Sequence, residues 1–503
     1  MRDGAYRQDD RMTKTAPKSV AVCLTAAFAG LLVPVAVSLK QRFGTKVHLY
    51  VRLPQEKLGF QHLIDSGQAD SITLIPSFRS PGPCDQMDDQ ELFALAREYE
   101  KRLSLPLVRL TFTHRFLGRG FNIGGYYYPK STLLNYKTSY RDQVRYYCNM
   151  LRFWENEFTE KTVDLSLQLP HEGIRAGHLA EIPHRRLDSS RYESFWLWTD
   201  NEFHSNSRVV ESYKRNDTVQ PRTLGGQYKG FGSASYFGKR PFMKMVSRII
   251  LYTGVYMRRR MKSDMQETIR YWQNVHRLAL VYFSRVRLQK KFYKRLADLE
   301  DIPFLYLPLH KEPETGLQLM SPEFFHQHAM IVALASSLPA GTVLAIKENP
   351  KTMGCRHFSF YEQVSDLKNV MIMDDREPSL TLSEKSFAVS TVTGTAGLEA
   401  ALLGKPVILF GRHNMFDVLP HAKVVHDFAD LPDIVNDAFE EPGDLAVNKS
   451  EAERYMGCVI AHSFDAQSVW RNGAFQQDDD DSKIVVEHAT QKLLDSLEGA
   501  LTA

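Results

Sequence analysis

The hydrophobic positions of this chain fall into short buried runs that alternate with amphipathic stretches. An apolar run at 19–24 precedes a helical stretch at 34–43, Gly44 ends that stretch, and a second apolar run follows at 47–51. A strand, a helix, a glycine and another strand in this order form the opening unit of a doubly wound parallel sheet. The start of the chain therefore predicts an α/β domain.

The same N-terminal stretch also permits a membrane anchor. No charged residue occurs from Ser19 to Leu39, which is long enough to span a bilayer. Gly30 interrupts this run and Pro34 suits the first turn of a helix. Acidic residues before the run and the lack of a clear cleavage site argue against a signal peptide. We therefore favour a buried strand and helix, preceded by a disordered tail over 1–17.

The alternation continues along the chain, more clearly in its second half. In the first half we expect strands at 71–75, 163–169 and 195–198 and helices at 90–103 and 140–158. In the second half we expect strands at 304–309, 343–346, 370–373, 387–392 and 406–410, with helices at 322–338, 358–367, 379–384, 396–403 and 484–497. This pattern predicts two doubly wound domains, at 18–239 and 301–503, with a ligand cleft between them.

Residues 240–300 differ from both domains, because they form long amphipathic stretches without short buried runs. Between 256 and 295 there are 12 Lys and Arg and only two acidic residues, Asp264 and Glu267, which gives a local net charge of +10. Aromatic residues are interleaved with these charges. The segment is either a solvated helical face or a surface that contacts anionic lipid or a polyanionic saccharide.

Composition narrows the class of protein. The 503 residues carry a net charge of +4 and are 43% hydrophobic. A nearly balanced charge argues against a protein that coats nucleic acid. The five cysteines lie far apart without a CxxC pair, so they indicate neither a disulfide framework nor a thiolate zinc site, and we expect a reducing compartment.

The most informative segment is Ser390-Thr391-Val392-Thr393-Gly394-Thr395-Ala396-Gly397-Leu398-Glu399. A buried strand leads here into a loop of hydroxyls and glycines at the start of a helix. The free N–H groups of a first helical turn bind anions, Gly394 and Gly397 allow close approach, and Thr393 and Thr395 offer hydroxyls. We therefore predict a phosphate site, with Glu399 accepting hydrogen bonds from ribose. The alternative is a Thr-rich cap that serves only the helix.

Two further loops follow predicted strands of the second domain. His310 follows the first, and Lys347 and Asn349 follow the next, with Arg356 in the same polar loop. Lys347 is a point cation suited to a diphosphate or carboxylate, and His310 has a ring that can donate to a phosphoryl oxygen. Each of these loops is alternatively an ordinary capped turn. Their occurrence at successive strand ends favours one shared anion site.

These segments resemble the capsule polysaccharide biosynthesis proteins, which include Kdo transferases of bacterial capsule assembly. The resemblance extends over about 302–420 and rests on Leu307-Pro308-Leu309-His310-Lys311-Glu312-Pro313-Glu314, Ile346-Lys347-Glu348-Asn349-Pro350, Gly354 with Arg356, Phe360-Tyr361, Thr393-Gly394-Thr395-Ala396-Gly397-Leu398-Glu399-Ala400 and Gly404-Lys405-Pro406-Val407. Many relatives carry His at the position of Asn349, where it contacts the donor phosphate. Asn349 can donate a hydrogen bond but carries no positive charge.

The resemblance implies a GT-B glycosyltransferase without a bound metal or cofactor. The C-terminal domain then holds the nucleotide-sugar donor, with CMP-Kdo as the first expectation, and the N-terminal domain holds a lipid-linked or polysaccharide acceptor. Glu172, in the loop His171-Glu172-Gly173, is the expected base, because it resembles the acidic residue followed by Gly in related transferases. A capping carboxylate is the alternative for Glu172. We expect a cytoplasmic protein, peripheral on the inner membrane through 256–295, that binds no nucleic acid.

Two alternatives to glycosyl transfer remain. One is another reaction on a GT-B-like scaffold, such as glycerophosphate transfer or nucleotide-sugar epimerisation. The other is a non-catalytic subunit that binds polysaccharide during assembly, which the basic helices and Asn349 would also fit. Nucleotide binding separates this subunit from the enzymes.

Overall fold

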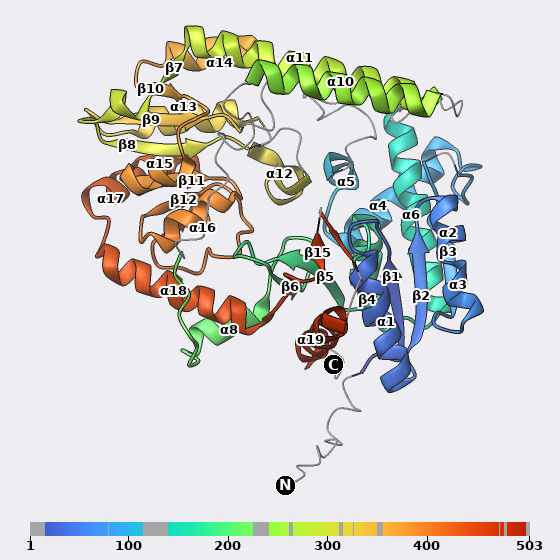
Figure 1. Ribbon diagram of the computed structural model, residues 1–503. Helices are drawn as coiled ribbons and strands as arrows, with labels where there is room; N and C mark the ends of the chain where they lie inside the picture. Colours follow the sequence, from blue (N-terminus) through green and yellow to red (C-terminus); the bar gives the residue numbers. More distant parts are fainter. Residues whose placement is uncertain are drawn as a thin grey trace. The chain divides into compact units, whose positions relative to one another are not determined.

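The computed structural model describes residues 16–78, 80–113, 139–224, 241–260, 265–310, 315–324, 326–349, 356–471, 473–476 and 480–498. The chain divides into two compact units. Unit 1 contains Met1–Thr111, Thr138–Val219 and Gly457–Ala503, and unit 2 contains Phe112–Lys137 and Gln220–Met456. Figure 1 shows the elements of both units.

Unit 1 is built around a seven-stranded sheet in the order β14-β6-β5-β4-β1-β2-β3. Strands β3, β2, β1, β4 and β5 are parallel, and β6 is antiparallel to both of its neighbours. Its elements are β1 (Ser19–Cys23), α1 (Ala29–Phe43), β2 (Lys46–Val51), α2 (Pro54–Gly59), α3 (Gln61–Asp65), β3 (Ser71–Leu74), α4 (Asp89–Leu103), α5 (Val108–Thr113), α6 (Tyr140–Glu160), β4 (Leu165–Leu167), α7 (His171–Leu179), β5 (His184–Ser189), β6 (Phe195–Thr199), α8 (Ser207–Lys214), β14 (Ser463–Asp465), β15 (Trp470–Arg471), β16 (Ala474–Phe475) and α19 (Asp480–Leu497).

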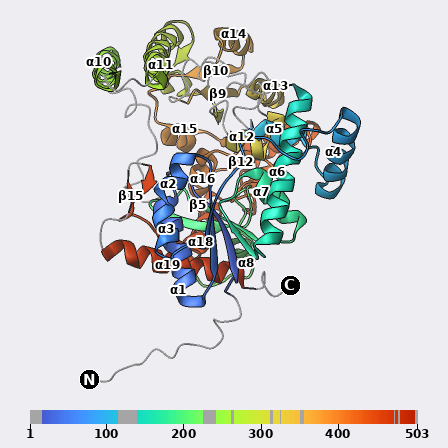
Figure 2. The same ribbon diagram turned by 90° about the vertical axis from the view of Figure 1, so that its right-hand side faces the viewer.

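Helices cover both faces of this sheet (Figure 2). On one face, α1 and α19 contribute Leu32, Val35 and Leu493 to a core with the apolar side chains of β1 and β2. On the other face, Trp154 of α6 packs against Tyr50 of β2, with ring centroids 4.8 Å apart and ring planes tilted by 49°. A sheet covered on both faces needs apolar residues at nearly every position of its strands, which is why the short runs along the chain are continuously hydrophobic.

The first helix differs from its prediction, because it starts at Ala29 and includes both Gly30 and Pro34. Gly30 does not break the helix but permits a close packing contact. A Cβ at this position would lie 2.1 Å from the carbonyl oxygen of Phe475 in β16. Glycine is therefore required where α1 passes the C-terminal segment. The chain from 19 to 39 forms β1 and α1, as predicted, and none of the described helices is long and apolar enough to cross a membrane.

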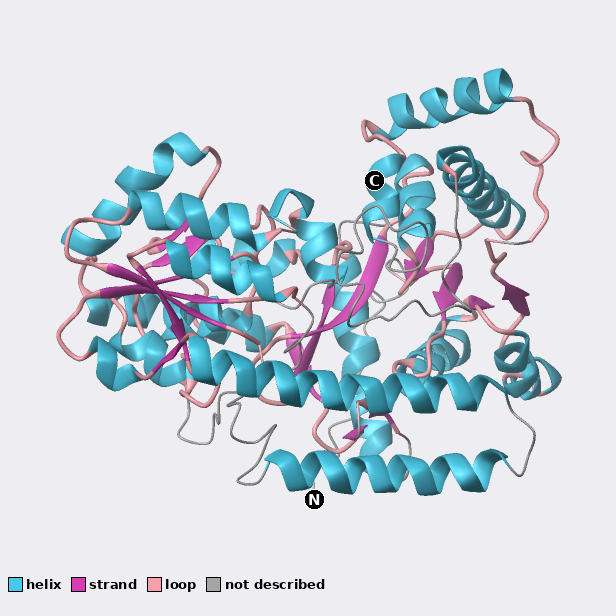
Figure 3. Cartoon of the chain, turned by 90° about the horizontal axis from the view of Figure 1, so that it is seen from above, coloured by secondary structure: helices cyan, strands magenta, loops and turns pink. Residues whose placement is uncertain are grey.

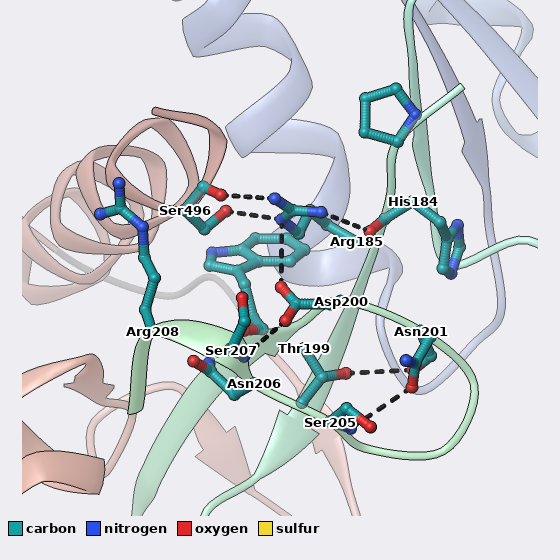
Figure 4. A network of polar contacts seen from close by, with 12 residues as sticks. His184, Arg185, Thr199, Asp200, Asn201, Ser205, Asn206, Ser207, Arg208 and Ser496 are labelled. Carbon is teal, nitrogen blue, oxygen red and sulfur yellow. Dashed lines mark hydrogen bonds and ion pairs between the residues drawn. The ribbon is translucent and has the colours of Figure 1, made fainter. Parts of the chain in front are cut away.

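The C-terminal segment joins unit 1, whereas the sequence assigned all of 301–503 to the second domain. Strand β14 extends the sheet beside β6, and the indole of Trp198 donates to the carbonyl of Ala489 in α19 at 2.8 Å. Figure 4 shows a second tie, in which Arg185 of β5 donates to the hydroxyl and carbonyl of Ser496 and pairs with Asp200. The apolar face of α19 packs on the unit 1 sheet. The periodicity of the sequence predicts that this helix buries one face, but not which sheet that face packs on.

Unit 2 contains a second seven-stranded sheet, fully parallel, in the order β13-β12-β11-β8-β9-β10-β7. Its elements are α10 (Pro241–Arg260), α11 (Met265–Lys291), β7 (Tyr293–Lys294), the 3-10 turn Leu296–Leu299, β8 (Phe304–Pro308), α12 (Thr315–Met320), the 3-10 turn Pro322–Phe324, α13 (Gln327–Ser337), β9 (Val343–Lys347), α14 (Phe358–Asp366), β10 (Val370–Met373), α15 (Ser379–Lys385), β11 (Ala388–Thr391), α16 (Thr395–Leu402), β12 (Val407–Leu409), β13 (Ala422–Val424), the 3-10 turn Phe428–Asp430, α17 (Leu431–Glu440) and α18 (Leu445–Ala461).

The segment predicted as basic helices, 240–300, belongs to unit 2. Its last strand, β7, pairs with β10 at the edge of the sheet, and Val281 and Leu288 of α11 are buried in the core beneath α13 and α14. Strand β7 therefore forms an edge of the unit 2 sheet and α11 packs on its core, so this part of the segment belongs to unit 2 and is not a linker. The chain therefore contains two Rossmann-like units, as predicted.

Candidate active site

The candidate residues of unit 2 gather at the carboxyl edge of its sheet. His310 follows β8, Lys347 and Asn349 end or follow β9, and Thr393 and Gly394 follow β11. The chain runs from β8 outward through β9 and β10, and then returns to place β11 on the other side of β8. Open α/β sheets bind ligands at this reversal of strand order. His310 and the loop 391–394 lie on its two sides.

His310 connects these two strand ends. Its Nε2 lies 2.9 Å from the hydroxyl of Thr391 and accepts from the backbone N–H of Val392 at 3.2 Å. The backbone N–H of His310 donates to the side-chain oxygen of Gln327 in α13 at 2.7 Å. Because Nε2 accepts a hydrogen bond from the backbone N–H of Val392, it is the unprotonated ring nitrogen. The His310 ring therefore stabilises the turn that precedes α16. A direct contact of His310 with phosphate stays a prediction.

The glycines of this turn have a packing role beside any role toward a ligand. A Cβ on Gly394 would lie 2.7 Å from the Thr391 hydroxyl, and one on Gly397 would lie 2.7 Å from the Thr391 methyl and 2.9 Å from Phe416. Both glycines thus fit the strand against its own helix. Thr395 is the first residue of α16 and is half-buried, as is Gly394 at the N-cap. The N–H of Gly397 donates to the carbonyl of Gly394 at 3.1 Å. The first turn of a helix, with its positive dipole end, favours an anion.

Lys347 brings a positive charge to the same edge. Its side chain is buried, and its ammonium donates to the hydroxyl of Ser379 at 2.8 Å. Burial lowers the pKa of Lys347 to about 8, although Asp375, Glu377 and Glu399 act in the opposite direction. The negative charge of Glu399 thus acts at Lys347, so the predicted ribose and phosphate residues belong to one electrostatic cluster.

Arg356 is buried in an ion pair rather than exposed in a loop. Its guanidinium donates to both carboxylate oxygens of Glu348 and, at 2.7 Å, to the carbonyl of His310. The hydroxyl of Tyr361 donates to the same carboxylate at 2.6 Å. One guanidinium nitrogen contacts both carboxylate oxygens and the other contacts the His310 carbonyl, so this buried pair fixes the geometry of both loops. Arg356 therefore positions the β8 and β9 loops, and its predicted contact with a ligand stays untested, as does that of Asn349.

Asp374 and Asp375 follow β10 at this edge, and each forms an ion pair with an arginine. Asp375 pairs with Arg285 of α11 in a buried contact of 3.0 Å, and Asp374 pairs with Arg376. Within the described residues, no three His, Cys, Asp or Glu side chains are grouped as metal ligands would be. The sequence did not predict the partnership of Arg285, because it joins residues ninety positions apart.

Glu172 lies at the corresponding place in unit 1. The strand order of this sheet reverses between β1 and β4, and Glu172 is the second residue of α7, directly after β4. Its carboxyl group is buried. Burial raises the pKa of Glu172, while the positive charge of Arg52 acts in the opposite direction. A carboxylate whose pKa is raised in this way is better matched to proton transfer near neutral pH.

The surroundings of Glu172 include residues that the sequence did not single out. Arg52 follows β2 and interacts with Cys23 at the end of β1, and burial raises the pKa of that thiol to about 11. Gly173 lies against Trp154, whose ring would be 2.9 Å from an added Cβ. Arg52 follows a predicted strand directly, so the strand-end rule that selected Glu172 would also have selected it.

The described geometry therefore has two candidate centres, each at the strand-order reversal of its own sheet. Residues 255–419 match the family of capsule polysaccharide biosynthesis proteins. The resemblance predicted from the sequence is confirmed over this segment, which contains every unit 2 candidate from His310 to Glu399. Glu172 lies outside it. The search of curated proteins found no match.

Several solved structures are similar in fold at low sequence identity. The KpsC beta Kdo 2,7 transferase of Thermosulfurimonas dismutans is 11% identical, over 74% of this chain and 94% of its own, with a TM-score of 0.34. HepE of Anabaena, in complex with UDP and glucose, is 12% identical over 96% and 100% of the two chains, with a TM-score of 0.30. The UDP-GlcNAc 2-epimerase of Methanocaldococcus jannaschii is 10% identical over 88% and 99%, with a TM-score of 0.26.

Proposed function

We propose that the protein is a glycosyltransferase of capsule polysaccharide biosynthesis. It would transfer a sugar from a nucleotide donor, with CMP-Kdo as the first candidate, to a lipid-linked or growing glycan. The observation that carries this proposal is that the family match coincides with the phosphate-type cluster at the reversal of the unit 2 sheet. The same proposal makes the nucleotide sugar a substrate and requires no cofactor.

In this scheme the donor phosphate is bound by the first turn of α16 and by Lys347, with the Thr393 and Thr395 hydroxyls as further donors. Glu399 accepts hydrogen bonds from the ribose. The bond between the anomeric carbon and the phosphate oxygen breaks, and the nucleoside monophosphate leaves with the electron pair of that bond. Cationic and dipolar groups stabilise this departing charge, which is the reason to expect no metal requirement.

The acceptor side of the reaction is assigned to Glu172 of unit 1. The acceptor hydroxyl attacks the anomeric carbon and forms the new glycosidic bond, while its proton passes to the Glu172 carboxylate. The raised pKa of Glu172 supports this role, because a stronger base removes a hydroxyl proton more readily. The positive charge of Arg52 acts in the opposite direction and favours the ionised carboxylate.

Titration calorimetry with CMP, CDP and UDP tests the nucleotide site. We expect one nucleotide to bind, and Glu399→Ala to weaken it about tenfold or more through the loss of hydrogen bonds to a charged group. Glu362→Ala, which removes an exposed carboxylate on α14, is the matched control. Unchanged affinity in Glu399→Ala would remove the ribose role.

Incubation with labelled donor sugars then separates the candidate reactions. A glycosyltransferase gives labelled glycan or glycolipid, whereas an epimerase or hydrolase gives free or rearranged sugar. Transfer that persists in a chelator supports the metal-independent scheme. A protein that binds saccharide but no nucleotide would contradict the proposal and indicate an assembly subunit.

A further inference from the structure

Helix α10 carries an exposed apolar face. Met243, Ile250, Leu251, Val255 and Met257 are all exposed large hydrophobic residues, and three of them are at least 60% exposed. At 100° per residue their spacing, together with Gly254, places them on one side of the helix. We call this set the α10 stripe. The exposed Ser247 shares this side of the helix, but five large apolar side chains on one side are more than singly scattered exposed hydrophobic residues give.

The stripe is not the side through which α10 packs in the protein. Helix α11 is buried against the unit 2 sheet through Val281 and Leu288, and α10 packs along α11, with Phe242 against Tyr282. Figure 3 shows the two long helices running beside one another. The helix therefore has one face for α11 and a second apolar face, the stripe, that the described protein leaves in water.

The charge of α10 indicates what covers this face. The helix contains five basic residues, Lys244, Arg248 and Arg258–Arg260, and no Asp or Glu. Lys244 and Arg248 lie one turn apart along the edge of the stripe that Leu251 and Val255 form, and the pKa of Lys244 is lowered by burial and by the charge of Arg248. A second copy of this helix would bring like charges together. An anionic saccharide would satisfy the charges but leave the stripe in water.

We propose that α10 is an interfacial anchor, which inserts the stripe into the surface of a bilayer containing anionic lipids. An apolar face bordered by Lys and Arg is the pattern of helices that lie in the membrane plane. With no described helix able to span a membrane, α10 would lie along the interface for about 30 Å. This inference differs from the predicted contact at 256–295, since the stripe occupies 243–257.

Flotation of the full chain with vesicles tests the anchor. We expect binding to vesicles of phosphatidylcholine with phosphatidylglycerol, and little binding to phosphatidylcholine alone. Ile250→Asp with Leu251→Asp should abolish binding. Lys244→Gln with Arg248→Gln should weaken it about fivefold per charge and reduce its dependence on salt. Val447→Asp, at an exposed position of α18, is the matched control.

Gly254→Leu provides a test that does not depend on loss of function. A Cβ at Gly254 meets no atom within 4 Å, so the larger side chain fits and enlarges the stripe. We expect vesicle binding about tenfold tighter or more from the added buried area. Unchanged far-UV circular dichroism and an unchanged unfolding midpoint in all variants would show that the fold is intact.

Three results would overturn the anchor. The first is vesicle binding that the stripe variants do not change. The second is a wild-type dimer in the absence of lipid that becomes a monomer in Ile250→Asp, because the stripe would then be a self-association surface. The third is binding to an acidic polysaccharide, without binding to vesicles, that the apolar substitutions leave intact. None of these depends on glycosyl transfer, so the anchor and the proposed function can fail separately.

Discussion

At the scale of single residues, Glu172 permits a test that separates chemistry from folding. We expect Glu172→Gln to lower the rate of transfer by about 10²- to 10⁴-fold, the usual contribution of a general base. Because the folded state raises the pKa of Glu172, its ionised form at neutral pH costs stability, which Gln removes. Steady-state kinetics and thermal unfolding at pH 7 should thus show lost activity without lost stability. An active Glu172→Gln protein would contradict its assignment as the base.

Lys347 predicts a pH dependence for the binding of nucleotide. With a pKa of about 8, this side chain is charged at pH 7 and largely neutral at pH 10. An anionic ligand binds the charged form better, so affinity for CMP should be highest below pH 8. Above pH 8 it should decline by up to about tenfold per pH unit, until the pKa of Lys347 in the complex is reached.

Calorimetry across this range, with Lys347→Met as the comparison, checks the prediction. The variant should bind CMP weakly and with little change between pH 7 and pH 10. If Lys347→Met shows the same decline as the wild type, another group is responsible and Lys347 does not contact the phosphate.

At the scale of elements, two helical glycines have opposite surroundings. Gly397 of α16 has no room for a Cβ, while Gly254 of α10 has open space. Gly397→Ala should cost about 1–3 kcal/mol in the free energy of unfolding, through overpacking against Phe416 and Thr391. It should also weaken the binding of CMP, because the turn before α16 shifts. Gly254→Ala should raise stability by about 0.5–1 kcal/mol. Equal effects of the two substitutions on unfolding would contradict this packing account.

The elements also show how far the sequence predicts this fold. Short apolar runs gave the strands from β8 to β12, because a parallel sheet buried on both faces needs continuous hydrophobicity. The loops that follow them were therefore placed correctly at strand ends. The roles of Arg356 and Gly397 were not predictable, since the Glu348 carboxylate and the Phe416 ring that explain them are fixed only by tertiary packing. Gly30 was misread for the same reason, because its contact lies at Phe475.

At the scale of the whole molecule, the return of 457–498 to unit 1 ties the two ends of the chain into one core. The helical period of α19 shows that it buries one face but not which sheet receives that face. The core explains the assignment, since Leu493 packs with residues of β1 and α1, far away in sequence. Unit 2 has its own buried cluster, to which Leu334 of α13 belongs.

These separate cores predict opposite responses to two equivalent truncations. Leu493→Ala and Leu334→Ala each remove a fully buried leucine, at an expected cost of about 2–5 kcal/mol. Hydrogen exchange measured by mass spectrometry should show that Leu493→Ala deprotects peptides of β1, β2 and β4 and leaves those of β8 to β12 protected. Leu334→Ala should give the reverse pattern. If Leu493→Ala instead deprotected β11 and β12, the C-terminal segment would be part of the second core, as a single domain over 301–503 requires.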